Sequence, residues 1–110
     1  MKKHGCETAK KKFTNTDKTT LDNANNTITK LTHYGLRKET APSNGVLLSW
    51  SNGARKWTVT RSEVKKGEIL SLDANEVFLP VDKRTAERIQ LCLSELPLYR
   101  NSFEARYGGL

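Results

Sequence analysis

The chain has 110 residues, enough for one folded domain with a modest core but too few for two independent domains. Nineteen Lys and Arg residues against twelve Asp and Glu residues give a formal net charge of +7, which favours polyanionic partners such as nucleic acid. No apolar run approaches the roughly 20 residues that a membrane-spanning helix needs, so we expect a protein that has no membrane partner and stays in the cytoplasm.

The first 18 residues are predicted to form a flexible basic arm. They are mostly Lys and Thr, and they lack the apolar periodicity whose burial offsets the entropy lost on ordering. Six lysines against two acidic residues give this arm a charge of +4, more than half of the net charge. Residues 19–110 are then expected to form a single domain, with Lys10, Lys11 and Lys12 of the arm available to phosphate groups.

A helix of weak propensity is predicted over residues 19–35. Its apolar residues recur at helical spacing, whereas its many Asn and Thr residues lower the helix propensity. Thr20 or Asp22 is available as the N-cap, and Gly35 as the C-cap. The residues that follow, 37–45, have the composition of a linker.

The pair Asn52-Gly53 predicts a β-hairpin between the segments VLLSW and KWTVT, because a type I′ turn needs positive φ at both central residues. Counting outward from a two-residue turn places Trp50 opposite Arg55 and Leu48 opposite Trp57. One face of the hairpin is expected to hold Val46, Leu48, Trp50, Arg55, Trp57 and Val59. The other is expected to hold Leu47, Ser49, Lys56, Thr58 and Thr60.

Two further short strands are predicted over residues 69–72 and 76–79, and with the hairpin they complete a four-stranded antiparallel meander. Asp82 is a suitable N-cap for a helix that runs to Leu96 and packs its apolar face on the sheet. A second short helix is predicted over residues 98–107. The expected fold class is therefore α+β: a small single domain in which C-terminal helices cover a four-stranded meander, with a weak N-terminal helix and a disordered basic arm.

The sequence carries no catalytic or cofactor motif. Cys6 in the arm and Cys92 in a predicted helix do not make a disulfide framework, so we expect both to be reduced. A Cys or Ser nucleophile would need a histidine base, and the two histidines are His4 in the arm and His33 at a helix end. There is no Gly-rich phosphate loop, and two ligands on an arm do not make a metal site. We expect no cofactor, no metal and no enzymatic activity.

The strongest binding signal is a basic stretch beside the tryptophans. Between Arg55 and Lys66, five cations stand against a single glutamate. We expect Trp57 to be a core residue, because it faces an apolar residue across the hairpin, whereas Trp50 near the turn is either core or an exposed platform for a base. The candidate nucleic-acid-binding residues are Trp50, Arg55, Lys56, Arg61, Lys65 and Lys66 of the hairpin and Lys10, Lys11 and Lys12 of the arm.

The predicted C-terminal helix carries a second binding signal. Arg84 lies in its first turn, where the helix dipole disfavours cations, and Arg84 and Arg88 repel one another at i,i+4. Leu91 falls among charged residues, as a protein-contact anchor does, although single exposed leucines are common. An aromatic stripe over residues 99–107 is either core or a docking surface. The candidate protein-binding residues are Arg84, Arg88, Leu91, Tyr99, Phe103 and Tyr107.

Two classes of function fit these features. The first is a small, basic, non-enzymatic nucleic-acid-binding or regulatory protein whose partner is DNA or RNA. The second is a protein-binding inhibitor or adaptor that occludes a larger host protein complex through its C-terminal helical surface. The small size, the basic arm and the lack of catalytic residues are typical of accessory proteins of phages and plasmids, and the aromatic stripe is compatible with a homodimer.

Overall fold

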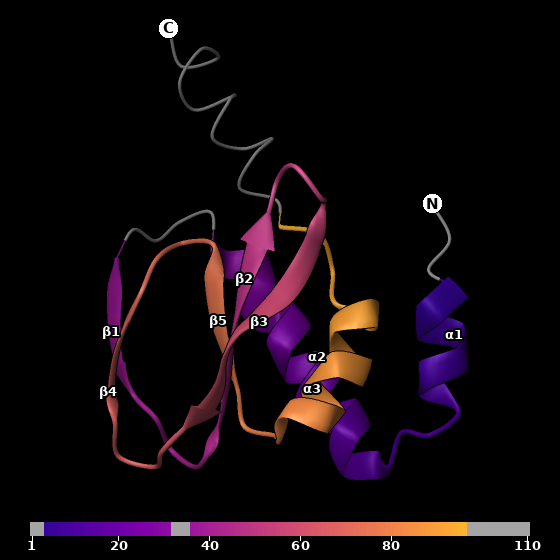
Figure 1. Ribbon diagram of the computed structural model, residues 1–110, viewed down its shortest axis with the longest axis horizontal. Coiled ribbons are helices and arrows are strands. Elements are labelled where there is room, and N and C mark those ends of the chain that lie inside the picture. Colours follow the sequence, from indigo (N-terminus) through magenta and orange to yellow (C-terminus); the bar gives the residue numbers. More distant parts are fainter. Residues whose placement is uncertain (1–3, 32–35, 97–110) are drawn as a thin grey trace, which may run out of the picture.

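The computed structural model describes residues 4–31 and 36–96. Within these ranges the order of elements is α1 (His4–Lys10), α2 (Asn15–Lys30), β1 (Arg37–Thr40), β2 (Gly45–Ser51), β3 (Lys56–Val64), β4 (Ile69–Leu72), β5 (Glu76–Leu79), α3 (Lys83–Ile89) and the 3-10 turn η2 (Gln90–Cys92). Figure 1 shows the strands on one side of the molecule, with α3 and α1 beyond them and α2 behind. The α+β class expected from the sequence is confirmed.

The strands form two small antiparallel sheets rather than one meander. One sheet has the order β3-β2-β5, and the other pairs β1 with β4. The segment expected to be a linker supplies β1, in which Thr40 lies opposite Ile69 and Arg37 opposite Leu72. The sequence of β1 shows no apolar alternation, because the strand is held mainly by its backbone pairing with β4. The prediction of a single four-stranded meander is therefore wrong in its topology.

The hairpin is confirmed, but its register is shifted by two residues. Trp50 lies opposite Trp57, and Ser51 lies opposite Lys56. The loop thus holds four residues, and it ends at Arg55, whose φ of 54° lies in the left-handed region. A shift of two residues keeps every strand side chain on its expected face, so Trp57 still points into the core, where it is 1% exposed.

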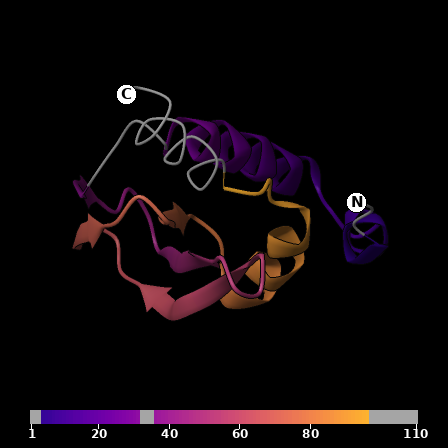
Figure 2. The same cartoon turned by 90° about the horizontal axis from the view of Figure 1, so that it is seen from above.

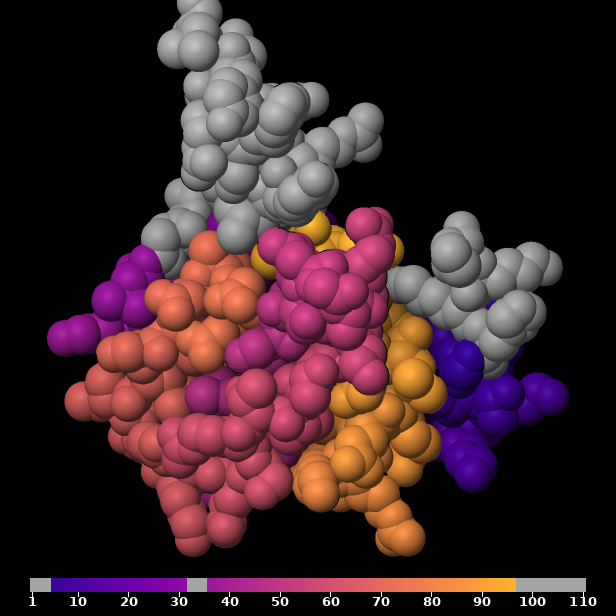
Figure 3. All heavy atoms as spheres, turned by 45° about the horizontal axis from the view of Figure 1, so that its top comes forward, coloured from indigo at the N-terminus to yellow at the C-terminus, as the bar shows by residue number. Residues whose placement is uncertain are grey.

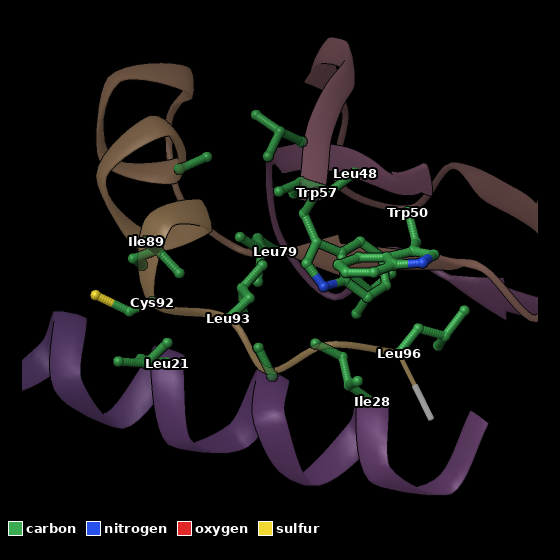
Figure 4. Packing of buried hydrophobic residues seen from close by; sticks show 14 of the residues in the cluster. Leu21, Ile28, Leu48, Trp50, Trp57, Leu79, Ile89, Cys92, Leu93 and Leu96 are labelled. Carbon is green, nitrogen blue, oxygen red and sulfur yellow. The ribbon is translucent and has the colours of Figure 1, made fainter. Parts of the chain in front are cut away.

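The central strand β2 has a core on each side. Towards the helices, Leu48 packs with Trp57 and Ile28 in the larger cluster, part of which is drawn in Figure 4. On the opposite face, Leu47 packs in a second cluster with Leu72. Leu47 was expected on a polar outer face, but the pair β1–β4 covers that face. The members of this smaller cluster are Ala41, Leu47, Val64, Leu70 and Leu72.

The helix α2 begins earlier than expected. The N-cap is Thr14 rather than Thr20 or Asp22, because Thr14 and Asp17 form a capping box: Asp17 N donates to Thr14 Oγ1 at 3.1 Å, and Thr14 N donates to Asp17 Oδ2 at 3.2 Å. Figure 2 shows α2 lying along the side of the molecule opposite β3. The expected C-cap, Gly35, lies outside the described residues.

The segment expected to be a disordered arm has regular structure from His4 onward. The helix α1 packs on α3 and η2, and a disulfide joins Cys6 of α1 to Cys92 of η2. Neither cysteine is reduced, contrary to expectation, because the fold brings together two residues 86 positions apart. Closing a loop of this length restricts the unfolded chain, which stabilises the fold by about 4 to 5 kcal/mol in the chain-entropy account.

The helix α3 begins at the expected N-cap, Asp82, but it ends at Ile89 rather than at Leu96. The turn η2 follows, after which Leu93 adopts an extended conformation. The apolar residues expected to share one helix face, among them Ala86 and Leu96, are nevertheless buried. The short helix expected over residues 98–107 lies outside the described residues.

Gly45 provides a test of how closely β2 and β5 approach. A β-carbon there would meet the backbone oxygen of Leu79 and lie 2.6 Å from the ring of Phe78. Gly45→Ala is therefore expected to lower the free energy of unfolding by about 1 to 3 kcal/mol, as measured by urea denaturation. Gly53→Ala is the matched control, since the nearest atom lies 4.0 Å away, and it should change stability by less than about 0.5 kcal/mol. Equal losses would contradict this packing.

Asp82 provides a test that depends on pH. Its carboxylate accepts hydrogen bonds from Thr85 Oγ1 at 2.7 Å and from the backbone N of Arg84 at 3.2 Å, and these bonds, that of Thr85 foremost, lower its pKa from 3.8. A lowered pKa stabilises the fold above the unfolded-state value, and this contribution is lost as pH falls through the folded-state value.

Asp82→Ala should therefore cost about 1 kcal/mol at neutral pH, and the difference from the parent protein should shrink below pH 3.8. Asp82→Asn keeps an acceptor for the cap and should show a smaller loss, which also shrinks below pH 3.8 because the contribution removed is that of the charge. Thermal unfolding at several pH values measures both. A loss from Asp82→Ala that is the same at pH 3 and pH 7 would rule out the charged cap.

Candidate nucleic-acid interface

The two tryptophans belong to the core. Trp57 is 1% exposed and Trp50 is 8% exposed, and their rings meet edge to face with centroids 5.6 Å apart. Trp57 Nε1 donates to the backbone oxygen of Ser94 at 2.9 Å, and Trp50 Nε1 donates to Asn52 Oδ1 at 2.7 Å. Figure 4 shows both indoles between the strands and the segment that carries Leu96. Trp50 thus has too little exposed ring surface to be a platform for a base.

Three of the five cations of the hairpin stretch have carboxylate partners. Arg55 Nη2 lies 3.0 Å from Glu95 Oε1. Arg61 binds both carboxylate oxygens of Glu68, and Lys65 Nζ lies 3.3 Å from Glu63 Oε2. The remaining two, Lys56 and Lys66, have no ion-pair partner among the described residues. Lys56 is the first residue of β3, and Lys66 lies two residues beyond its last, so these two cations are separated by the length of the strand.

The pair Arg61–Glu68 stays charged over a wide range of pH. The hydrogen bonds from Arg61 lower the pKa of the Glu68 carboxyl, and the same contact raises the pKa of Arg61. Arg61 is exposed and Glu68 is half-buried at the surface, so the pair contributes little to stability. Its effect on binding is larger, because a phosphate group would have to compete with a carboxylate that is already in place.

A different surface holds exposed cations without carboxylate partners. We call it the basic end and define it by Lys10, Lys11, Lys12, Lys18 and Arg84. All five are exposed, and none has an ion-pair partner within residues 4–31 and 36–96. Lys18 was not a candidate site residue. The capping-box pattern that begins at Thr14 could have revealed it, because it places this lysine on the first turn of a helix.

The fold brings these residues together from three elements. The helix α1 runs beside α3 in the opposite direction, so its last turn lies at the same end of the molecule as the first turns of α2 and α3 (Figure 1). Lys11 N and Lys12 N donate to the carbonyls of Thr8 and Ala9, so the backbone of both lysines continues the turns of α1. In the space-filling view, α1 projects from the side of the molecule next to α3 (Figure 3).

Arg88 connects two of these elements. Its Nη2 atom lies 3.8 Å from Asp17 Oδ2, so the guanidinium of α3 reaches the capping box of α2. Its Nε atom is buried and has no hydrogen-bond partner among the residues that the structure describes. The sequence placed Arg88 in a protein-binding surface, whereas the structure gives it a contact between helices. Arg84, one turn earlier, remains exposed.

Leu91 lies beside a groove of about 570 Å³ between the hairpin loop and η2. It is 43% exposed, and its other side packs on α1, where a β-carbon on Gly5 would lie 3.2 Å from Leu91 Cδ1. The groove is lined by Trp50, Arg55 and Lys56 on the hairpin side and by Gln90, Leu91 and Glu95 on the other. The aromatic candidates Tyr99, Phe103 and Tyr107 lie outside the described residues.

The described residues contain no group of three or more His, Cys, Asp or Glu side chains that could hold a metal ion. No helix in the same part of the chain is long and apolar enough to cross a membrane. Comparison with known proteins identifies no family: no family model matches the chain, and no curated protein or solved structure is significantly similar to it.

Proposed function

We propose that this protein binds nucleic acid through the phosphate backbone, with the basic end as the contact surface. One observation carries the proposal: five exposed cations belong to the end of α1 and the first turns of α2 and α3, which lie at one end of the molecule (Figure 1), and none of them forms an ion pair within the described residues. Phosphate contacts of this kind supply affinity without reading sequence. DNA and RNA share this chemistry, so the proposed activity is non-enzymatic and tolerant of sequence.

The proposed interface is the basic end and not the hairpin. A cation held by a carboxylate must give up that partner before it can release counterions from a polyanion, whereas Lys10 to Lys12 need no such exchange. The backbone of these lysines is placed by α1, so less conformational freedom is lost on binding than for a flexible arm. The lysines of the predicted arm thus remain the proposed binding residues, and α1 orders their backbone.

Replacing three lysines together tests the proposal. For the variant Lys10→Gln, Lys11→Gln, Lys12→Gln, we expect weaker binding to a labelled DNA duplex. The slope of log affinity against log salt should fall by about 0.9 for each lost phosphate contact, between about 50 and 200 mM salt. Fluorescence anisotropy measures both quantities.

The matched control removes the same charge from the hairpin, as Arg55→Gln, Arg61→Gln, Lys65→Gln. It should change the salt slope less, because these cations have carboxylate partners. Equal slopes for the two triple variants would place the interface elsewhere. Absence of binding by the parent protein at low salt would end the proposal altogether.

A protein-binding inhibitor or adaptor is the second candidate, and it is supported by the groove beside Leu91. An exposed leucine next to a hollow with apolar walls and a charged rim has the arrangement of a protein-contact anchor. The rim carries both signs of charge, from Arg55 and Lys56 on one side and Glu95 on the other. This surface is separate from the five cations of the basic end.

Leu91→Glu tests this second candidate. An affinity pull-down from host lysate, treated with nuclease, should lose its bound protein when Leu91 is replaced, because a carboxylate would enter an apolar contact. Ile69→Glu is the matched control, since Ile69 is 71% exposed on β4 and far from the groove, and it should keep the bound protein. If nuclease alone empties the pull-down, nucleic acid was the link and the second candidate fails.

A further inference from the structure

The helix α1 buries little apolar surface apart from its disulfide. It has only seven residues, too short for a helix to be stable alone in water. Of its side chains from Gly5 to Lys10, only Cys6 and Ala9 are buried. It packs on α3 and η2. Because the apolar surface it buries is small, the covalent bond to Cys92 is the main restraint on its position.

The boundary of this weakly held segment is well defined. The next side chain that packs on the core is Phe13, which is partly buried against the larger cluster. Immediately after it, the capping box of Thr14 and Asp17 closes the first turn of α2 without any contribution from α1. Residues 4–12 can therefore detach while α2 keeps its cap. Lys10, Lys11 and Lys12 belong to the detachable part.

We infer that residues 4–12 form a redox-controlled latch, which holds the basic end together when the disulfide is closed and dismantles it when the disulfide is reduced. The inference rests on the proposed function and adds its regulation. A closed latch keeps Lys10 to Lys12 at the same end of the molecule as the first turns of α2 and α3 (Figure 1). An open latch separates them, and the loss of Gly5 from its contact uncovers Leu91 and the thiol of Cys92.

The reductant is a protein dithiol, which acts by thiol–disulfide exchange. One of its thiolates attacks a sulfur of the Cys6–Cys92 bond, which breaks that bond, forms a mixed disulfide and frees one protein thiolate. The second thiol of the dithiol attacks the mixed disulfide and releases the other cysteine. The protein gains two electrons and two protons as two thiols, and the dithiol becomes a disulfide. Both sulfur-bearing residues are 6 to 7% exposed, so attack requires a local opening of α1.

Limited trypsin digestion tests the latch directly, because its lysines are cleavage sites. The protein is treated with dithiothreitol or left oxidised, blocked with iodoacetamide and digested briefly, after which all samples are reduced and weighed by mass spectrometry. We expect cleavage after Lys10, Lys11 or Lys12 to accelerate about tenfold or more on reduction, since an opened helix is a far better substrate. The variant Cys6→Ser should be cleaved rapidly in both conditions.

The near-ultraviolet circular dichroism of the buried tryptophans distinguishes a latch from general unfolding. We expect the signal to persist on reduction, because the two indoles contact each other and Trp57, on a strand that contacts α3 and η2, is hydrogen-bonded to Ser94. An unchanged rate of cleavage would overturn the inference, and so would loss of the tryptophan signal. Neither readout involves nucleic acid, so the latch can fail while the proposed function stands.

Binding to a labelled DNA duplex tests the regulatory part. Reduction should weaken binding by roughly tenfold at fixed low salt, because the freed lysines must be ordered again on the polyanion. Cys6→Ser should bind as weakly as the reduced protein, with or without dithiothreitol. If digestion shows that α1 opens on reduction but the two redox states bind the duplex with equal affinity, the proposed regulation is wrong. No binding in either state would overturn the proposed function and leave the latch itself established.

Discussion

The strand β2 buries side chains on both of its faces, and the rest of the structure follows from the need to cover them. On one face, Leu48 and Trp50 require the helices; on the other, Leu47 requires the separate pair β1–β4. If no apolar layer covered one of these faces, that face would be exposed to water, at a cost of about 25 cal/mol for each Å² of apolar surface. The second sheet is therefore a consequence of β2 rather than an accessory to it.

This arrangement restricts where a function can reside. With both faces of the central strand covered, the sheet offers no open apolar platform within residues 4–31 and 36–96, and the two tryptophans are part of the interior. At the surface, ion pairs determine which cations are available to a ligand. Arg55 is neutralised by Glu95, forty residues away along the chain, and Arg61 by Glu68. The net charge of +7 therefore does not indicate which cations of the folded chain lack an ion-pair partner.

Much of the fold could be predicted because its signals are local. The hairpin, the strand segments near residues 69–72 and 76–79, the cap at Asp82 and the burial of Trp57 each follow from a turn pair, an alternation or a cap visible in a few residues. The polar strand β1 has no such signal, because its pairing with β4 depends on a backbone thirty residues away. The hairpin register depended on the packing of Trp50 with Trp57, which a turn pair does not specify.

The candidate site was less predictable for a related reason. Lys10 to Lys12 were proposed as binding residues from composition, but they follow a helix that is joined to η2 by a disulfide between cysteines that no sequence pattern linked. The role of Arg88 depended on its approach to Asp17, and the neutralisation of the hairpin depended on carboxylates that lie far away in the sequence. Local patterns report which groups are charged, whereas the tertiary fold decides which of them are free to bind.

The disulfide also changes how the domain responds to mechanical load. The α-carbons of Cys6 and Cys92 are 4.8 Å apart, and the intervening chain, which contains the whole of both sheets, lies within a closed covalent loop. A pulling force applied to the chain before residue 6 and after residue 92 would pass through the sulfur–sulfur bond. The sheets would carry almost none of it, so in its oxidised form the domain would act as a rigid, inextensible link in whatever assembly holds its two ends.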